Sequence, residues 1–293
     1  MSNPTEGHGA APNMDSLLPR EMALKAEQVG MAKAAMDFGK MFTLAVLAGA
    51  FIALGAVFST TVTAGAQALP LGVARLLGGL TFCLGLILVI VAGAELFTGN
   101  TLMVMAWAGG RVKSSQLLRN WVIVYLGNLA GAWGTAALVL AGEQYTLGGG
   151  AVGLNALNLA QGKCAMGFLP ALALGVLCNT LVCLAVWLCY SARTVTDRVL
   201  AIIFPITAFV TSGFEHSVAN MYFISVGLGI KGLAGDGFWR AIGRAPADFS
   251  QLTWHNFLWV NLLPVTLGNI IGGTVLVGLV YWFVFLRSRP TAR

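Results

Sequence analysis

Charged side chains are scarce in this sequence of 293 residues. It contains 17 Lys and Arg and 11 Asp and Glu, so charged residues make up 10% of the chain, against about a quarter in a typical soluble domain. Hydrophobic residues make up 57%, and the mean hydropathy is +0.80. This composition excludes an ordinary soluble enzyme, a disordered chain and a coiled coil, and it predicts that lipid surrounds most of the chain.

Motifs of several other protein classes are also missing. The 5 cysteines form no CxxC pair and have no histidine at metal-binding spacing, so they indicate small buried residues and neither a metal nor a cofactor. An intramembrane enzyme is disfavoured without HExxH or GxSxG, and a water channel without paired Asn-Pro-Ala boxes. The net charge of +6 comes from scattered residues, which argues against nucleic-acid binding. We find no secretory signal in the polar N-terminal region.

Long runs without charge predict an all-α integral membrane protein with six spans, because about 20 apolar residues cross a bilayer. Ionisable groups interrupt the second and fifth runs near the middle. We expect a cytoplasmic segment at 1–40, with an amphipathic helix on the membrane or on the protein's own mouth, a channel domain at 41–286 and a cytoplasmic tail at 287–293. The uninterrupted runs are 41–74, 120–142, 164–192 and 256–286, and the interrupted ones are 76–110 and 199–230.

The distribution of basic residues predicts the orientation in the membrane. With the N-terminus inside, 5 of the 17 Lys and Arg residues fall outside and the other 12 inside, as the positive-inside rule requires. We therefore expect both termini to lie in the cytoplasm. The five outside residues are Arg75, Lys163, Lys231, Arg240 and Arg244.

A repeat links the two halves of the chain. Gly127-Asn128 in the third span matches Gly268-Asn269 in the sixth, and the interruption at Glu95–Asn100 matches that at Glu215–Asn220. Because three crossings end on the opposite side, the second unit is expected to be inverted, as in many transporters and channels. The Gly-Asn pairs fit either close helix packing or amides that face a pore.

The two interrupted runs are too long for straight spans, since as helices they would reach about 50 Å. Glu95, Glu215 and His216 lie at the expected breaks, and ionisable groups at that depth are costly. Each glutamate could accept hydrogen bonds from backbone amides freed at its break, or contact a substrate. His216 points more strongly to function, because the first repeat has Phe97-Thr98 there. A scaffold protein without transport would leave these breaks unexplained.

At these residues the sequence resembles the formate/nitrite transporter family, and most of all its formate channels. The similarity runs from Ser16-Leu17-Leu18-Pro19 through Gly-Phe-Glu-His-Ser-Val-Ala-Asn-Met at 213–221 to the segment 261–269. The resemblance implies a homopentamer in the bacterial inner membrane, in which each protomer has its own pore, with an aquaporin-like arrangement of helices.

The resemblance also implies roles for individual positions along the substrate pathway. These are a central histidine and the threonine that faces it, an adjacent carboxylate, two flanking amides, a vestibule lysine that attracts anions, and two hydrophobic constrictions. The central histidine is His216 and the threonine that faces it is Thr98. Glu215 is the adjacent carboxylate, Asn179 and Asn269 are the flanking amides, and Lys163 is the vestibule lysine. The constrictions are Phe82 and Leu86 on the cytoplasmic side and Phe209 on the periplasmic side.

The expected function is a channel or transporter for a small monovalent anion, with formate first and nitrite, acetate or hydrosulfide as alternatives. Glu95 and Gly99 resemble the nitrite branch, whereas the 261–269 segment resembles the formate branch. We expect His216 to hydrogen-bond the anion between the constrictions and, in one version, to protonate it. The sequence leaves open channel or proton symport, the direction of flow, and gating by the N-terminal helix.

Overall fold

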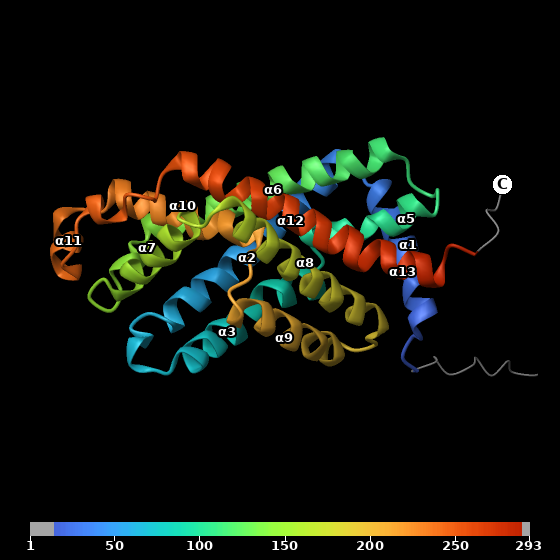
Figure 1. Cartoon of the computed structure of the whole chain (residues 1–293), viewed down its shortest axis with the longest axis horizontal. Coiled ribbons are helices and arrows are strands. Elements are labelled where there is room, and N and C mark those ends of the chain that lie inside the picture. Colours follow the sequence, from blue (N-terminus) through green and yellow to red (C-terminus); the bar gives the residue numbers. More distant parts are fainter. Residues whose placement is uncertain (1–14, 289–293) are drawn as a thin grey trace, which may run out of the picture.

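The computed structural model describes residues 15–288, and these form a bundle of helices without any strand (Figure 1). The outer parts of the two cytoplasmic segments expected from the sequence, residues 1–14 and 289–293, lie outside the described residues. Arg289 and Arg293, which the charge distribution places inside, belong to that remainder. Both ends of the described chain lie at one end of the molecule, and α11 (Asp236–Ile242) lies at the other.

The first half of the chain builds three spans, and the second of them is broken as predicted. Its first helix ends at Gly93, whose φ of 83° lies in the left-handed region that favours glycine. The backbone is extended at Leu96 before a new helix starts. The helices are α1 (Pro19–Ala34), α2 (Phe38–Val62), α3 (Leu71–Ala92), α4 (Phe97–Asn100), η2 (Thr101–Met103), α5 (Val104–Ala108) and α6 (Ser114–Ala141), with η1 (Ala66–Ala68) between α2 and α3.

The second half repeats this plan. The fifth span stops before Gly213, which has a φ of 73°, and starts again after His216 in extended conformation. Two π-helical segments, η5 and η6, flank α12 in the last span, where Pro264 has no N–H to donate. The helices are α7 (Ala151–Cys164), α8 (Phe168–Ser191), α9 (Val195–Thr211), α10 (Ser217–Leu233), α11, η5 (Asn256–Leu262), α12 (Leu263–Ile271), η6 (Gly272–Leu279) and α13 (Val280–Phe285), with η3 (Gln144–Thr146) and η4 (Pro246–Phe249) in connections.

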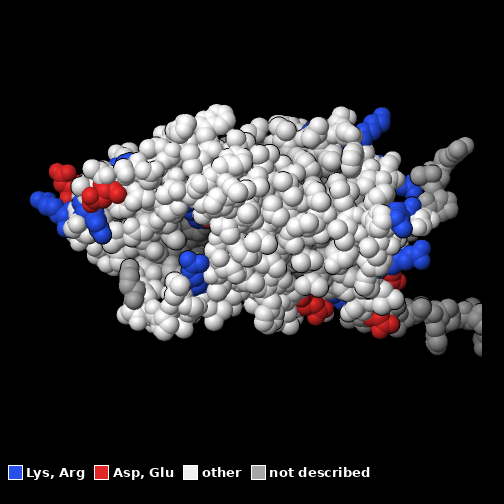
Figure 2. All heavy atoms as spheres, in the orientation of Figure 1, with Lys and Arg blue, Asp and Glu red and all other residues white. Residues whose placement is uncertain are grey.

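The surface agrees with a protein that spans a membrane. Within residues 15–288, five helices are long and apolar enough to cross a bilayer, and the number reaches six if the pair α10 and α11, which bends by 112°, counts as one span. In the fifth span, α9 and α10 have only 17 residues each because the break divides them. Figure 2 shows a broad uncharged band between two ends where the charged side chains gather. The predicted membrane fold is confirmed.

Equivalent helices of the two halves make equivalent contacts. In the first half α2 packs against α3 and α6, and in the second half α8 packs against α9 and α12. The glycines of the Gly-Asn pairs lie at these contacts, since a Cβ at Gly127 would meet Ala45 and one at Gly268 would meet the Leu172 carbonyl. Close packing therefore explains both glycines, whereas the asparagines beside them have a different role.

The N-terminal helix packs on the protein itself. α1 contacts α5, η2, α8 and α13, and it buries Met22 and Ala26 of its apolar face while Leu18 stays 67% exposed. Of the two locations expected for this helix, the structure therefore has the one on the channel domain. One of its basic residues, Lys33, reaches the break in the second span, so the boundary expected at residue 40 does not separate α1 from the functional region.

Candidate functional site

The two breaks meet through the pair that the family resemblance implies. Thr98 Oγ1 in α4 lies 3.0 Å from His216 Nε2 at the start of α10. Thr98 is 0% exposed and His216 3% exposed, so the contact is isolated from bulk solvent. The broken spans thus place one threonine hydroxyl and one imidazole face to face in the core.

The hydrogen bonds of His216 determine where its ring proton lies. The backbone N–H of Ala219 donates to Nδ1 at 3.0 Å, which caps the first turn of α10. A nitrogen that accepts this bond carries no hydrogen, so the ring is neutral and its proton lies on Nε2. Nε2 therefore donates to Thr98 Oγ1, and the hydrogen of the Thr98 hydroxyl is directed elsewhere. Two donors are left close together for an incoming acceptor.

A cavity of about 520 Å³ leads to this pair from the surface. It opens between the end of α2, the start of α3, α7 and α10, and Figure 2 shows a hollow left of centre with basic side chains beside it. His216 lies in its lining, together with the rings of Phe82 and Phe209 and the side chains of Lys163 and Glu215. We call this cavity the vestibule.

Two phenylalanines restrict the inner part of the vestibule. The centroid of the Phe209 ring lies 5.7 Å from that of Phe82, edge to face, and 5.9 Å from that of His216, nearly parallel. The prediction that Phe82 belongs with Leu86 to a separate, cytoplasmic-side constriction is therefore wrong. The reason is the register of α3 against α9, which sets Phe82 beside Phe209. Leu86, buried one turn further along α3, lies beyond the residues that line the vestibule.

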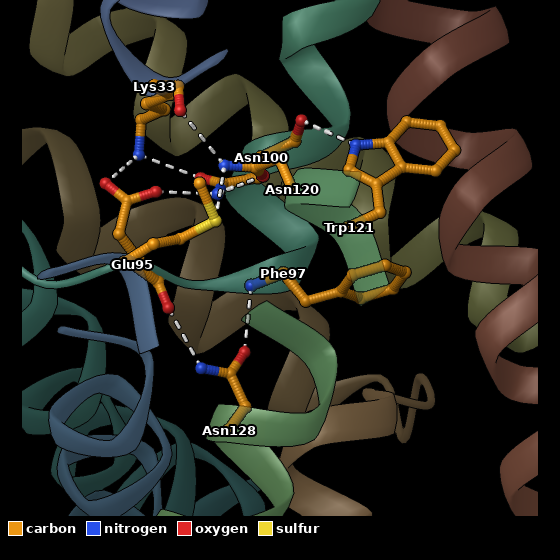
Figure 3. Close-up of polar contacts among 8 residues, drawn as sticks. Lys33, Glu95, Phe97, Asn100, Asn120, Trp121 and Asn128 are labelled. Atoms are coloured by element: carbon orange, nitrogen blue, oxygen red, sulfur yellow. Dashed lines mark hydrogen bonds and ion pairs between the residues drawn. The ribbon is translucent and has the colours of Figure 1, made fainter. Parts of the chain in front are cut away.

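A polar network fixes the break in the second span (Figure 3). Lys33 Nζ lies 2.7 Å from Glu95 Oε1 and donates to Asn100 Oδ1 at 2.8 Å. The amide of Asn100 donates to Glu95 Oε2 at 2.7 Å and to Asn120 Oδ1 at 2.9 Å. The network ties α1, the break, α4 and α6 together.

The break in the fifth span carries the matching network. Lys163 Nζ lies 2.7 Å from Glu215 Oε1. The amide of Asn220 donates to Glu215 Oε2 at 2.7 Å and to Asn261 Oδ1 at 2.8 Å. Lys163, predicted as a vestibule lysine that attracts anions, does line the vestibule, but its charge is paired with Glu215. Unlike Asn100 Oδ1, the buried Asn220 Oδ1 has no partner among the described residues.

Asparagines, and not the glutamates, bind the freed backbone at the breaks. Asn128 Oδ1 accepts from Phe97 N at 2.9 Å and its amide donates to Glu95 O at 2.9 Å. Asn269 does the same with Ser217 N at 2.9 Å and Glu215 O at 3.0 Å. The expectation that the glutamates accept from freed backbone amides is therefore wrong, because lysine and asparagine side chains occupy their oxygens.

Asn179 holds the segment that carries Thr98. Its amide donates to Asn269 O at 2.6 Å, to Thr98 O at 3.2 Å and to Thr101 Oγ1 at 3.2 Å. Its Oδ1 is buried and has no hydrogen-bond partner among the described residues. Asn179 and Asn269, predicted as amides beside the histidine, thus join the two breaks through backbone carbonyls, and neither donates to the imidazole.

Sequence reasoning missed five members of these networks, although a signal for them exists. The string Lys-x-Ala-Met-x-Phe occurs at 33–38 and again at 163–168, and in both breaks an asparagine follows the glutamate by five residues. Each string places a lysine just before the span that packs on the break. The missed residues are Lys33, Asn100, Asn120, Asn220 and Asn261. Among the described residues no three His, Cys, Asp or Glu side chains gather as metal ligands.

Comparison with known proteins agrees with this geometry. The model of the formate/nitrite transporter family matches residues 20–283. The formate channel FocA of Escherichia coli K12 is 48% identical over 274 residues, which cover 94% of this chain and 96% of FocA. FocA of Haemophilus influenzae is 43% identical over 263 residues, covering 90% and 93%.

Solved structures show the same relationship. A pentameric formate channel with formate bound matches with a TM-score of 0.82 at 48% identity and covers 85% of this chain and 98% of the other. An ion channel of the same family matches with a TM-score of 0.70 at 31% identity and covers 91% and 98%. These relatives are channels and transporters and not enzymes. The chain belongs to the formate/nitrite transporter family.

Proposed function

We propose that this protein is a channel for formate. Relatives that match over nine-tenths of the chain are named formate channels, and the structure with a TM-score of 0.82 is described with formate bound. Nitrite is the alternative within the family, with acetate and hydrosulfide behind it. The observation that carries the proposal is the buried contact of 3.0 Å between His216 Nε2 and Thr98 Oγ1 at the inner end of the vestibule.

This pair suits a small oxyanion. A carboxylate is a hydrogen-bond acceptor only, and here an N–H and an O–H converge from the two broken spans. An anion that passes Phe209 replaces the bond between His216 and Thr98 with one bond to each of them. Such bonds compensate part of the cost of removing the anion from water. A constriction with apolar side chains alone would have no hydrogen-bond donor to compensate this cost.

The same hydrogen bonds favour a channel over a proton symporter. A small carboxylic acid with a pKa near 4 is about a thousandfold more anion than acid at neutral pH, so symport requires His216 to donate a proton to the anion. A neutral ring protonated on Nε2 has first to gain a second proton on Nδ1. Nδ1 accepts a hydrogen bond from the Ala219 N–H. This bond caps α10, so it has to break each time a proton is transferred.

We also propose the assembly and the location that the sequence suggests. A homopentamer in the bacterial inner membrane agrees with the description of the structural relative as pentameric. It also agrees with the many exposed apolar side chains on the membrane-spanning helices. A cytoplasmic location of both termini agrees with the position of the two ends of the described chain, which lie at one end of the molecule (Figure 1). In that orientation the vestibule opens to the periplasm.

The test is uptake into proteoliposomes that contain the full-length protein. Formate, nitrite and hydrosulfide are compared as initial rates, together with the electrical current, from about pH 5 to about pH 8, the range in which a histidine titrates. The proposal predicts formate uptake well above that of empty liposomes, accompanied by current. Uptake of nitrite alone would contradict the substrate assignment, and formate uptake without current would contradict the channel assignment.

A further inference from the structure

The charges that line the vestibule do not cancel. Three charged side chains take part in the lining, namely Arg75, Lys163 and Glu215. Lys163 and Glu215 form an ion pair of 2.7 Å, and the Lys163 ammonium also lies 5.5 Å from the centre of the Phe223 ring. The pair contributes little net field at a distance, so the positive charge of the vestibule comes from Arg75.

The guanidinium of Arg75 is held at the wall of the vestibule beside the fifth break. Its Nη1 donates to Thr211 O at 3.3 Å, and Thr211 Oγ1 donates back to Arg75 O at 3.3 Å. A Cβ built on Gly213 would lie 2.7 Å from Nη1, so the guanidinium lies directly against the backbone of the break. Gly213 comes three residues before His216.

Most of the binding capacity of this guanidinium is unused. An arginine has five N–H donors in a planar fork that matches a carboxylate, and Arg75 uses one of them for a backbone carbonyl. Among residues 15–288 no carboxylate lies within ion-pair distance of it. Arg75 is also exposed, so an anion reaches it without prior desolvation.

We propose that Arg75 is the residue that collects and first binds the anion in the vestibule, the role that the sequence suggested for Lys163. This inference rests on the proposed function and deepens it. An uncompensated cation in a cleft with apolar walls raises the local concentration of anions. The planar fork favours carboxylates and other planar oxyanions over spherical anions. Thr211 and Gly213 set its position so that a bound anion lies next to the Phe209 constriction.

The test measures initial rates of formate uptake by proteoliposomes against formate concentration, at about 20 mM and about 500 mM of an impermeant salt. The variants are Arg75→Gln and Arg75→Lys. Arg244→Gln is the matched control, because it removes an exposed arginine near α11 that does not line the vestibule.

At low salt we expect Arg75→Gln to raise the half-saturating formate concentration about two- to fivefold. Arg75→Lys should show a smaller rise, and Arg244→Gln none. The difference should vanish at high salt, which a merely structural effect would not do. Equal half-saturation in Arg75→Gln and the unaltered protein at low salt overturns the inference.

Two further outcomes are also decisive. If Arg75→Gln fails to assemble, the inference is tested on the unaltered protein alone. A half-saturating formate concentration that does not change with salt then overturns the inference. If the unaltered protein takes up no formate, the proposed function fails separately, and the same comparison with nitrite tests Arg75.

Discussion

Replacing Lys163 with Met should destabilise the protein through Glu215 and not through lost surface charge. The Glu215 side chain is 4% exposed and that of Lys163 16%, so the substitution leaves a buried carboxylate without its cation. Breaking a buried pair costs about 3–5 kcal/mol. Asn220 and Asn261 still donate to Glu215 Oε2, so we expect the lower end, about 3 kcal/mol of unfolding free energy.

A double-mutant cycle with Glu215→Gln measures this coupling. The double variant has no buried charge at the break, and we expect it to regain about half of the loss or more, because the neutral amide oxygen still accepts from Asn220. Denaturant unfolding of the full-length protein in detergent gives the four free energies. Strictly additive losses, with a coupling energy near zero, would refute the view that Lys163 serves Glu215.

Formate uptake by the same variants separates two roles of Lys163. If its charge attracts anions, the double variant should transport as poorly as Lys163→Met. If it holds the break, as we infer, the double variant should transport better than the single one. The equivalent pair in the first repeat, Lys33 and Glu95, provides the control, because it has the same 2.7 Å geometry but lies outside the vestibule lining.

Three further predictions follow from the same geometry. Asn269→Leu and Asn128→Leu should each lower the unfolding free energy by about 2–4 kcal/mol, since each leaves a buried N–H and C=O unpaired; a loss below about 0.5 kcal/mol in a melting experiment contradicts this. Phe209→Ala should raise the uptake of larger carboxylates relative to formate, and an unchanged uptake ratio would show that Phe209 does not restrict the path. Burial, and then the charge of Arg193, lowers the pKa of Lys25 from 10.5. The charged Lys25 therefore destabilises the fold below its folded pKa, and the penalty disappears as pH rises towards 10.5. Lys25→Gln should slightly raise the melting temperature at neutral pH but not at alkaline pH, and an equal gain at both would contradict it.

The sequence revealed the spans and their breaks, because these depend on local properties, whereas the pairing of Thr98 with His216 came from the resemblance to the family. Apolar runs of sufficient length have to cross lipid, and an ionisable group in mid-span indicates where a helix opens. The repeat then relates one break to the other. For these features the composition of a short stretch is enough.

Other features depend on how separated elements pack, and local patterns miss them. Lys33 lies in a polar stretch that suggests a segment outside the channel, yet α1 turns it towards Glu95, 62 positions later in the chain. Phe82 joins Phe209 through the register of α3 on α9. The ion pair of Lys163 was missed because its partner, Glu215, is 52 positions away.

The most direct measurement is anion current through proteoliposomes carrying His216→Phe and His216→Gln. Glutamine keeps an N–H donor towards Thr98, whereas phenylalanine keeps only the shape. We predict that formate current falls about tenfold or more in His216→Phe, equivalent to one lost hydrogen bond to a charged group, and largely survives in His216→Gln. An undiminished current through the phenylalanine variant would mean that the anion crosses without using the imidazole at all.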